Sequence, residues 1–224
     1  MRRVIAMGVA VVFLGGTPAV ADLTTGRDKL VAGDYKTAIA ELTKVTGKDR
    51  PTARTMAARA QIVLGDHAGA EATLVPLAAT KDAQGAEARI LLAELRQLSG
   101  RIGEARKDLE ALYKERPDDR AVRTALGVVR YKQGAIVDAK LLFDKTIKEE
   151  DDNKLNYDDP VQMHQLAEAA RYTGSYKLAN DAYREALKLR PQLTDAGVEG
   201  ADLFMQNYAP PHAEQTHHEV FKIN

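Results

Sequence analysis

The sequence predicts an all-α protein, an α-solenoid built from helix-turn-helix hairpins, and three observations support this prediction. A glycine followed two residues later by a bulky residue and five residues later by an alanine occurs five times, at Gly33, Gly65, Gly100, Gly134 and Gly174. These glycines are 32, 35, 34 and 40 residues apart. Small and apolar residues with helical spacing follow each of them. Nearly the whole chain after its first residues is therefore predicted to form one array of similar hairpins.

Each of these glycines is expected to end a first helix and reverse the chain. Glycine has no Cβ, so it adopts the left-handed conformation that terminates a helix without steric cost. Pro51, Pro117 and Pro191 follow three of the second helices. A proline at such a position prevents the preceding helix from continuing. The start and the end of each hairpin are thus marked by residues with special backbone properties.

The second helix of each hairpin carries three residues at a spacing of four and then three, which places them on one face. The leading alanine is small enough to let the paired helix approach closely, and we expect the bulky residue three positions before it to cover the joint. The five sets are Ala38, Leu42 and Val45; Ala70, Leu74 and Leu77; Ala105, Leu109 and Leu112; Ala139, Phe143 and Thr146; Ala179, Tyr183 and Ala186.

The first helix of each hairpin carries a small residue seven positions before the turn glycine, where the two backbones are expected to cross. These residues are Gly26, Ala58, Ala93, Gly127 and Ala167. A period near 34 made of two helices and a tight turn resembles the tetratricopeptide repeat. The pattern is weaker in the first two hairpins, where Thr25 or Ala57 stands in the place of the usual leucine, and no tryptophan occurs where the family often has one.

The resemblance covers residues 22–224 and implies a right-handed α-solenoid with about five clear repeats and one divergent repeat. The repeats are expected at about 22–50, 51–82, 86–119, 120–148, 160–193 and 194–224. In the divergent sixth repeat, Tyr208 replaces the turn glycine. Its first helix is expected at about 194–207 and its second at 212–223. The second helix either caps the solenoid or leads into a longer array.

An insertion at residues 149–159 lengthens the step between the fourth and fifth glycines. Its acidic residues could offer oxygen ligands to calcium, but it lacks the alternating acids and the central glycine of a calcium loop. A solvated linker is therefore the favoured interpretation. Asp158 or Asp159 is expected to cap the helix that starts near Pro160, because a carboxylate accepts hydrogen bonds from the first free amides of a helix.

Residues 1–21 read as a secretory signal peptide. Arg2 and Arg3 precede an apolar run, and small residues at 19–21 resemble a cleavage site. The apolar run is short for a membrane span, so no stable span is expected after cleavage. We therefore expect a periplasmic or secreted bacterial protein. The sequence contains no cysteine, which excludes disulfides, thiol chemistry and a lipid attached to cysteine.

The charge balance indicates that nucleic acid is not the partner. The chain has 32 basic and 32 acidic side chains, and removal of the signal peptide would leave 30 basic against 32 acidic. A nucleic-acid binder usually carries a basic excess or stripe. A protein or a peptide is the expected ligand.

In the family that this chain resembles, first helices line the concave surface. Counting by register places candidate partner-binding residues on that surface, with cations early in the array and tyrosines later. They are Arg27, Arg59, Glu94, Tyr131, Lys132, Glu168, Arg171 and Tyr172. Such a surface suits an extended or helical peptide. The lysine and asparagine set with which some relatives bind carboxyl-terminal tails is not reproduced.

No catalytic residue, cofactor or metal site is expected. The only sequence cluster that suggests a metal is formed by His212, Glu214, His217 and His218, and these side chains cannot all converge within one helix. The leading hypothesis is a non-enzymatic periplasmic scaffold that binds a partner protein or peptide, in envelope assembly or secretion. The alternatives are a structural module, either the leading repeats of a larger array or a self-associating solenoid, and a metal-dependent protein or enzyme that uses the terminal histidines.

Overall fold

A computed structural model describes residues 23–191 and 193–207. Within these ranges the chain forms eleven α-helices and one short 3-10 helix. The predicted signal peptide, the second helix of the sixth repeat and the terminal histidine cluster lie outside the described residues. The helices are α1 (Leu23–Val31), α2 (Tyr35–Leu42), α3 (Arg50–Val63), α4 (His67–Ala78), α5 (Ala83–Leu98), α6 (Ile102–Glu115), α7 (Arg120–Lys132), α8 (Ile136–Asp151), α9 (Pro160–Thr173), α10 (Tyr176–Leu189) and α11 (Thr194–Asn207).

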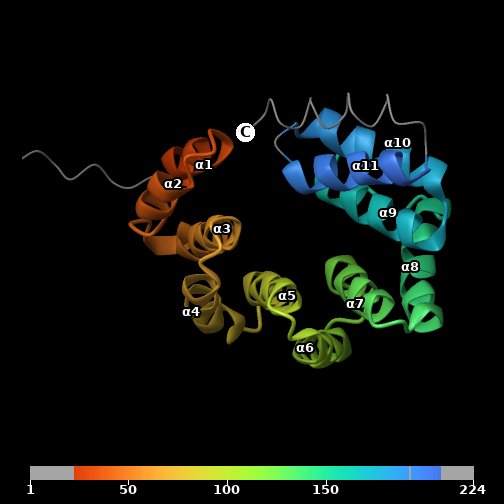
Figure 1. The fold of residues 1–224 in the computed structure, drawn as a ribbon, viewed down its shortest axis with the longest axis horizontal. Coiled ribbons are helices and arrows are strands. Elements are labelled where there is room, and N and C mark those ends of the chain that lie inside the picture. The colour runs from red at the N-terminus through yellow and green to blue at the C-terminus, as the bar shows by residue number, and fades with distance from the viewer. Residues whose placement is uncertain (1–22, 192, 208–224) are drawn as a thin grey trace, which may run out of the picture.

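The helices pack as consecutive hairpins along a strongly curved path (Figure 1). The first helices of the hairpins, α3, α5, α7 and α9, contact one another in sequence and line the inner side of the curve, and α11 continues this inner row. The second helices α4, α6, α8 and α10 lie outside them. The predicted all-α solenoid of hairpins is confirmed.

The turn glycines have the predicted conformation. All five adopt a positive φ, between 74° at Gly33 and 83° at Gly174. At the first two turns, an aspartate directly after the glycine caps the second helix: the side chain of Asp34 accepts a hydrogen bond from the Thr37 amide, and Asp66 accepts one from the Gly69 amide. A short glycine-aspartate sequence therefore ends one helix and begins the next.

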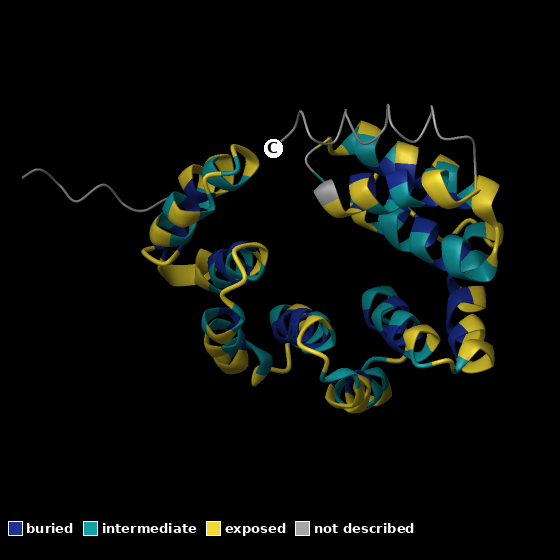
Figure 2. Ribbon diagram, in the orientation of Figure 1, coloured by how far each residue is buried: buried dark blue, intermediate teal, exposed yellow. Residues whose placement is uncertain are grey.

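The predicted inner faces of the second helices form the core. Fourteen of the fifteen residues at the four-then-three spacing are buried, and Leu77 is half-buried. Buried residues lie on the faces where helices meet (Figure 2), and the small residues of the first helices are among the buried ones. A Cβ added to Gly127 would lie 2.6 Å from the Phe143 ring, and one added to Gly26 would lie 2.5 Å from Leu42.

Two details of the predicted packing are wrong. Ile136 and Tyr176 do not cover the hairpin joint, because they are 45% and 41% exposed. The acidic insertion is not entirely a solvated linker either.

Helix α8 extends through the first part of that insertion to Asp151, and the chain turns only at Asn153, which has a φ of 53°. Glu149 on the last turns of α8 accepts a hydrogen bond from Arg120 at 2.7 Å and one from Arg123 at 2.6 Å. Asp159 caps α9 as predicted, since it accepts hydrogen bonds from the amides of Val161 and Gln162. No helix among the described residues combines the length and apolarity that crossing a membrane requires.

Candidate functional site

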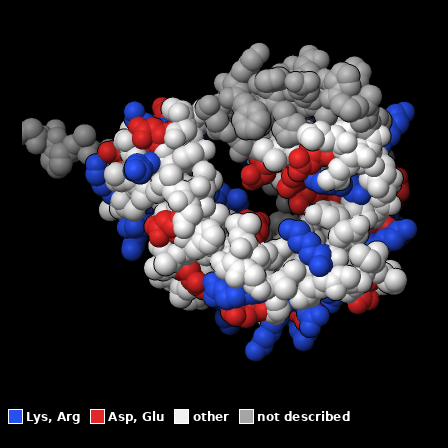
Figure 3. All heavy atoms as spheres, in the orientation of Figure 1, with Lys and Arg blue, Asp and Glu red and all other residues white. Residues whose placement is uncertain are grey.

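The inner side of the curve carries a concentration of charged residues. Figure 3 shows acidic atoms gathered on the wall of the central opening, beside basic atoms. Residues whose charges act on one another come from helices that are far apart in the sequence: Arg59 from α3, Glu94 from α5, His164 and Glu168 from α9, and Asp195 and Glu199 from α11. The curvature of the solenoid brings them into one electrostatic environment.

The clearest sign of this curvature is an ion pair between the beginning and the end of the array. The Arg59 guanidinium on α3 lies 4.0 Å from the Asp195 carboxylate on α11, and both side chains are well exposed. An exposed pair of this kind contributes at most about 1 kcal/mol to stability. The ion pair matters for the arrangement of the helices, because it shows that α3 and α11 face each other across the opening.

Glu94 lies within the influence of the same charges. Burial raises the pKa of its carboxyl, Arg59 opposes this rise, and the negative charges of Asp195 and Glu199 add to it. Burial is the largest cause of this rise, so the pKa of Glu94 reports a carboxyl that is withdrawn from water among charges of both signs.

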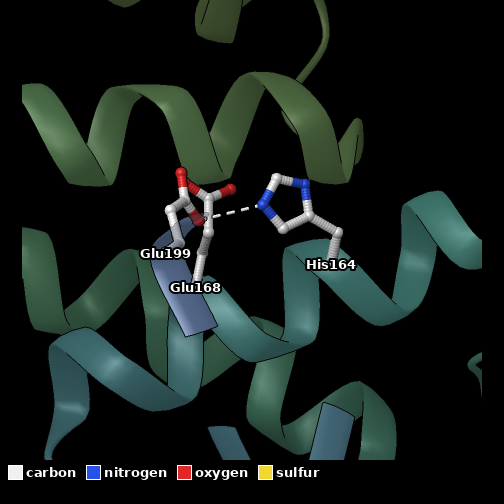
Figure 4. A group of neighbouring side chains, drawn as sticks. All are labelled: His164, Glu168 and Glu199. Carbon is white, nitrogen blue, oxygen red and sulfur yellow. Dashed lines mark hydrogen bonds and ion pairs between the residues drawn. The ribbon is translucent and has the colours of Figure 1, made fainter. Parts of the chain in front are cut away.

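His164, Glu168 and Glu199 form a tight group, here called the His-Glu cluster (Figure 4). His164 and Glu168 are four residues apart on α9, so they point from the same face, and Glu199 reaches them from α11. The His164 Nε2 lies 2.9 Å from the Glu199 Oε2. One potential ligand atom of each residue lies within 4.8 Å of the other two, so the group has the spacing needed to hold a metal ion.

Neighbouring residues hold Glu199 in place. The Tyr183 hydroxyl on α10 donates a hydrogen bond of 3.0 Å to the same Oε2 atom that pairs with His164. The Arg171 guanidinium donates one of 3.3 Å to the Glu199 backbone carbonyl. Side chains of α9 and α10 thus position this carboxylate of α11, which is a degree of positioning that an exposed surface glutamate does not need.

The pKa values of the cluster reflect burial and crowding. Burial alone would lower the pKa of His164, but the hydrogen bond to Glu199 and the negative charges of Glu168 and Glu199 outweigh it and raise the pKa to about 9. Burial raises the pKa of Glu168 to about 8, and Glu199 adds to the rise while His164 opposes it. Burial also raises the pKa of the Tyr183 hydroxyl.

We expect the stability of the metal-free protein to fall as the pH rises from about 6.5 to about 9. The folded-state pKa of His164 is above its unfolded value, so its contribution is complete below the unfolded pKa and is lost as the pH passes the folded pKa. The raised pKa of Glu168 acts in the same direction, and Asp195 and Glu94 face the pair with further negative charge. The positive charge of Arg59 opposes the rise in the pKa of Glu94, and that of Arg171 opposes the rise in the pKa of Tyr183.

The measurement is urea unfolding, followed by circular dichroism with a chelator present, of the wild type and the His164→Gln/Glu168→Gln double variant. The slope of stability against pH should be shallower in the variant. Equal slopes would show that these two groups do not bind the extra protons of the folded state.

A second feature of the inner wall is aromatic. The Tyr131 and Tyr172 ring centroids lie 4.8 Å apart, and the Tyr172 ring stacks on Phe143 at 5.2 Å with an interplanar angle of 9°. Tyr131 is 37% exposed whereas Phe143 is buried. The three rings therefore form a continuous path from the core to the inner surface.

The predicted partner-binding residues fall into two groups in the structure. Arg59, Glu94, Glu168 and Arg171 belong to the charged inner wall, and Tyr131 and Tyr172 form the aromatic pair. The remaining two are exposed, Arg27 on α1 and Lys132 on α7, and none of the interactions found within the described residues joins them to either group.

Sequence reasoning missed His164, Tyr183, Asp195 and Glu199. The expectation that only the terminal histidines suggest a metal is wrong, because the His-Glu cluster has suitable spacing. One signal was available: His164 lies one helical turn before Glu168, on the same face of α9. Counting one turn further toward the N-terminus of each first helix, at the register position of Glu168, would have included it. The approach of α11 to α3 had no such signal.

This architecture, stacked helical hairpins with a polar inner wall, defines an α-solenoid repeat protein of the kind that presents a concave surface. The tetratricopeptide repeat profile matches residues 23–86 and 90–153. The chain belongs to the tetratricopeptide repeat (TPR) family. No protein in the curated set matches the sequence.

Solved structures of low sequence identity share the fold. One chain of the crystal structure of the APC/C hetero-tetramer Cut9-Hcn1 is 19% identical, with a TM-score of 0.55, and the match covers 90% of this chain but 39% of that one. A thermophilic TPR protein of Thermus thermophilus is 21% identical, with a TM-score of 0.54, and the match covers 82% of this chain and 97% of that one. This chain therefore spans well under half the length of the first of these structures.

Proposed function

We propose that this protein is a non-enzymatic scaffold that binds a segment of a partner protein on its inner wall, in the bacterial periplasm or outside the cell. TPR proteins generally act as scaffolds for protein-protein interactions, and no catalytic family matches the chain. The signal-like residues 1–21 support the location. Envelope assembly and secretion are the processes that such a location would serve.

The observation that carries the proposal is the composition of the inner wall. Residues from α3, α5, α7, α9 and α11 place both charge signs and two tyrosines around one opening, while the small and apolar residues at the helix crossings form the core. A peptide can satisfy such a surface through its own charged side chains and its backbone groups. Tyr131 and Tyr172 offer apolar ring surface beside polar hydroxyl groups, which suits a partly solvated interface.

The test is affinity capture with crosslinking from the native cell envelope, with tagged residues 22–224 as the bait. The Arg59→Glu/Arg171→Glu variant reverses two charges of the inner wall. Its matched control, Arg106→Glu/Arg184→Glu, reverses two exposed arginines on the outer helices α6 and α10. Circular dichroism checks that both variants keep the helical content of the wild type.

We expect a partner that the wild type and the control retain and that the inner-wall variant loses. Calorimetry with the purified partner should then show at least about a tenfold weaker association for the inner-wall variant, about 1.4 kcal/mol. Equal retention by all three baits would overturn the assignment of the binding surface. Recovery of this chain alone would favour the structural-module alternative. The mass of the native chain shows whether the signal peptide has been removed.

A further inference from the structure

We propose that the His-Glu cluster of His164, Glu168 and Glu199 is a binding site for a divalent transition-metal ion, with Zn²⁺ as the ion that fits its ligands best. This property is independent of the scaffold function, because the site does not need a partner protein to form. Its residues come from two helices of the inner wall, α9 and α11, so a bound ion would lie on the concave side of the solenoid.

The geometry is close to that of a metal site before any movement. The His164 Nε2 and the Glu199 Oε2 are 2.9 Å apart, and the third ligand atom, from Glu168, lies within 4.8 Å of both. Two ligands that are each about 2.0–2.2 Å from a tetrahedral zinc ion lie about 3.3–3.6 Å apart. The His164–Glu199 separation of 2.9 Å is close to this value, so side-chain rotations are the movement needed to place all three ligand atoms around one ion.

The ligand types select the class of ion. One imidazole and two carboxylates make a mixed nitrogen and oxygen set, which suits zinc and other first-row transition ions. Calcium and magnesium prefer oxygen ligands alone and need more of them. Three protein ligands leave a coordination position open for water, as in zinc sites that are not purely structural.

The electrostatic surroundings favour a cation. Besides its own two carboxylates, the cluster has the carboxylates of Glu94 and Asp195 among its charged neighbours, and the cations Arg59 and Arg171 also act on members of this group. A divalent ion would add positive charge beside these four carboxylates.

A hydrogen bond from outside the cluster supports the same interpretation. Tyr183 is buried in the core between α9, α10 and α11, and its hydroxyl donates to the Glu199 Oε2 atom. Ligating carboxylates in metal sites are commonly oriented by such hydrogen bonds from neighbouring side chains. The competing explanation is a hydrogen-bonded polar cluster that needs no ion, and the experiment distinguishes the two.

The experiment must separate this site from the other histidines of the chain. The sequence has five histidines, three of which are His212, His217 and His218. These three are replaced by glutamine to give a reference protein. Calorimetric titration of the metal-free reference protein with Zn²⁺ should show one strongly bound equivalent per chain, and saturating Zn²⁺ should raise its melting temperature, because an ion that binds only the folded state stabilises it.

In this reference protein, His164→Gln and Glu168→Gln should each abolish the strong equivalent. Tyr183→Phe removes only the supporting hydroxyl and should weaken binding by about tenfold to a hundredfold. His67→Gln, at the first position of α4, is the matched histidine control and should bind as the reference does. Circular dichroism without metal confirms that each variant is folded.

Two results would overturn the proposal. The first is a strong equivalent that the original chain shows and the reference protein lacks, which would assign zinc binding to the terminal histidines. The second is absence of strong binding from the folded reference protein, which would leave the cluster as a hydrogen-bonded group without an ion. Loss of the equivalent with His164→Gln but not with His67→Gln would establish the site.

Discussion

Replacement of Glu149 by alanine is expected to lower the free energy of unfolding by about 3–5 kcal/mol, because it leaves a buried guanidinium without its partner. The Arg123 side chain is only 3% exposed, and its Nη2 lies 2.6 Å from a Glu149 carboxylate oxygen. Its only other side-chain hydrogen bond among the described residues goes to the Thr146 hydroxyl, at 3.4 Å. Removal of the carboxylate therefore leaves the Arg123 guanidinium charged and buried, without an ion-pair partner and without contact with water.

The repeat architecture provides a matched control for this change. Arg89 and Glu115 lie 34 residues before Arg123 and Glu149 and form the same pair of side chains one repeat earlier, at 2.6 Å. There the carboxylate is 50% exposed and the guanidinium 21% exposed, so both remain hydrated when the pair is broken. Glu115→Ala should accordingly cost no more than about 1 kcal/mol.

Urea unfolding followed by circular dichroism measures both variants. Burial would raise the pKa of Glu149, but the hydrogen bonds from Arg120 and Arg123 outweigh it and hold the pKa below its usual value. The contribution of this carboxylate is therefore present above the unfolded pKa and is lost as the pH falls through the folded pKa. The difference between the wild type and Glu149→Ala should shrink in acid, and similar losses in the two alanine variants at neutral pH would contradict the argument from burial.

The fold could be predicted from the sequence because each hairpin repeats the same local signals. A glycine with positive φ, a small residue at the crossing and mostly apolar residues at the four-then-three spacing agree with one another in each of the first five repeats. The agreement extended to α11, whose predicted range of 194–207 matches the observed helix Thr194–Asn207 although its turn glycine is missing.

The structure differs from the predicted linker where α8 continues to Asp151, and the difference has a physical reason. The acidic residues at 149–151 look like a solvated linker when they are considered alone, but no helix breaker separates them from the helix. The ion pairs of Glu149 with Arg120 and Arg123 then stabilise the additional turn. The partners lie on α7, at positions that the repeat pattern leaves unassigned.

The candidate site could be predicted only in part. Counting along the first helices found Arg59, Glu94 and Glu168, because residues at one register position lie on one face of the solenoid. It did not show that Asp195 on α11 would approach Arg59 on α3. That approach depends on the small rotation between neighbouring hairpins, which accumulates over the array and is not determined by any single residue.

Replacement of Phe143 by alanine is the second change for which we expect a loss of about 3–5 kcal/mol in the free energy of unfolding. Phe143 on α8 is among the largest fully buried side chains, and its ring packs against Gly127 of α7 and stacks on Tyr172 of α9. Truncation would leave a cavity where three helices meet. Leu141→Ala is the matched control, because this residue of the same helix is 61% exposed and should change stability by no more than about 0.5 kcal/mol.

A double-mutant cycle with Gly127→Ala tests whether the close crossing is the cause. Alone, Gly127→Ala should be destabilising, because its Cβ would lie 2.6 Å from the Phe143 ring. In the Phe143→Ala protein the ring is gone, so the same change should cost less, with a coupling of about 0.5–3 kcal/mol. Additive effects would show that α7 and α8 do not depend on this contact.

Phe143→Ala is also expected to alter the inner wall. Tyr172 packs between Phe143 and Tyr131, so loss of the Phe143 ring removes the support on which the aromatic pair rests. At temperatures where Phe143→Ala is still folded, its affinity for a captured partner should fall, while Leu141→Ala should bind as the wild type does. Unchanged partner affinity in a folded Phe143→Ala protein would exclude Tyr131 and Tyr172 from the binding surface and leave the charged residues of α3, α9 and α11 to form it.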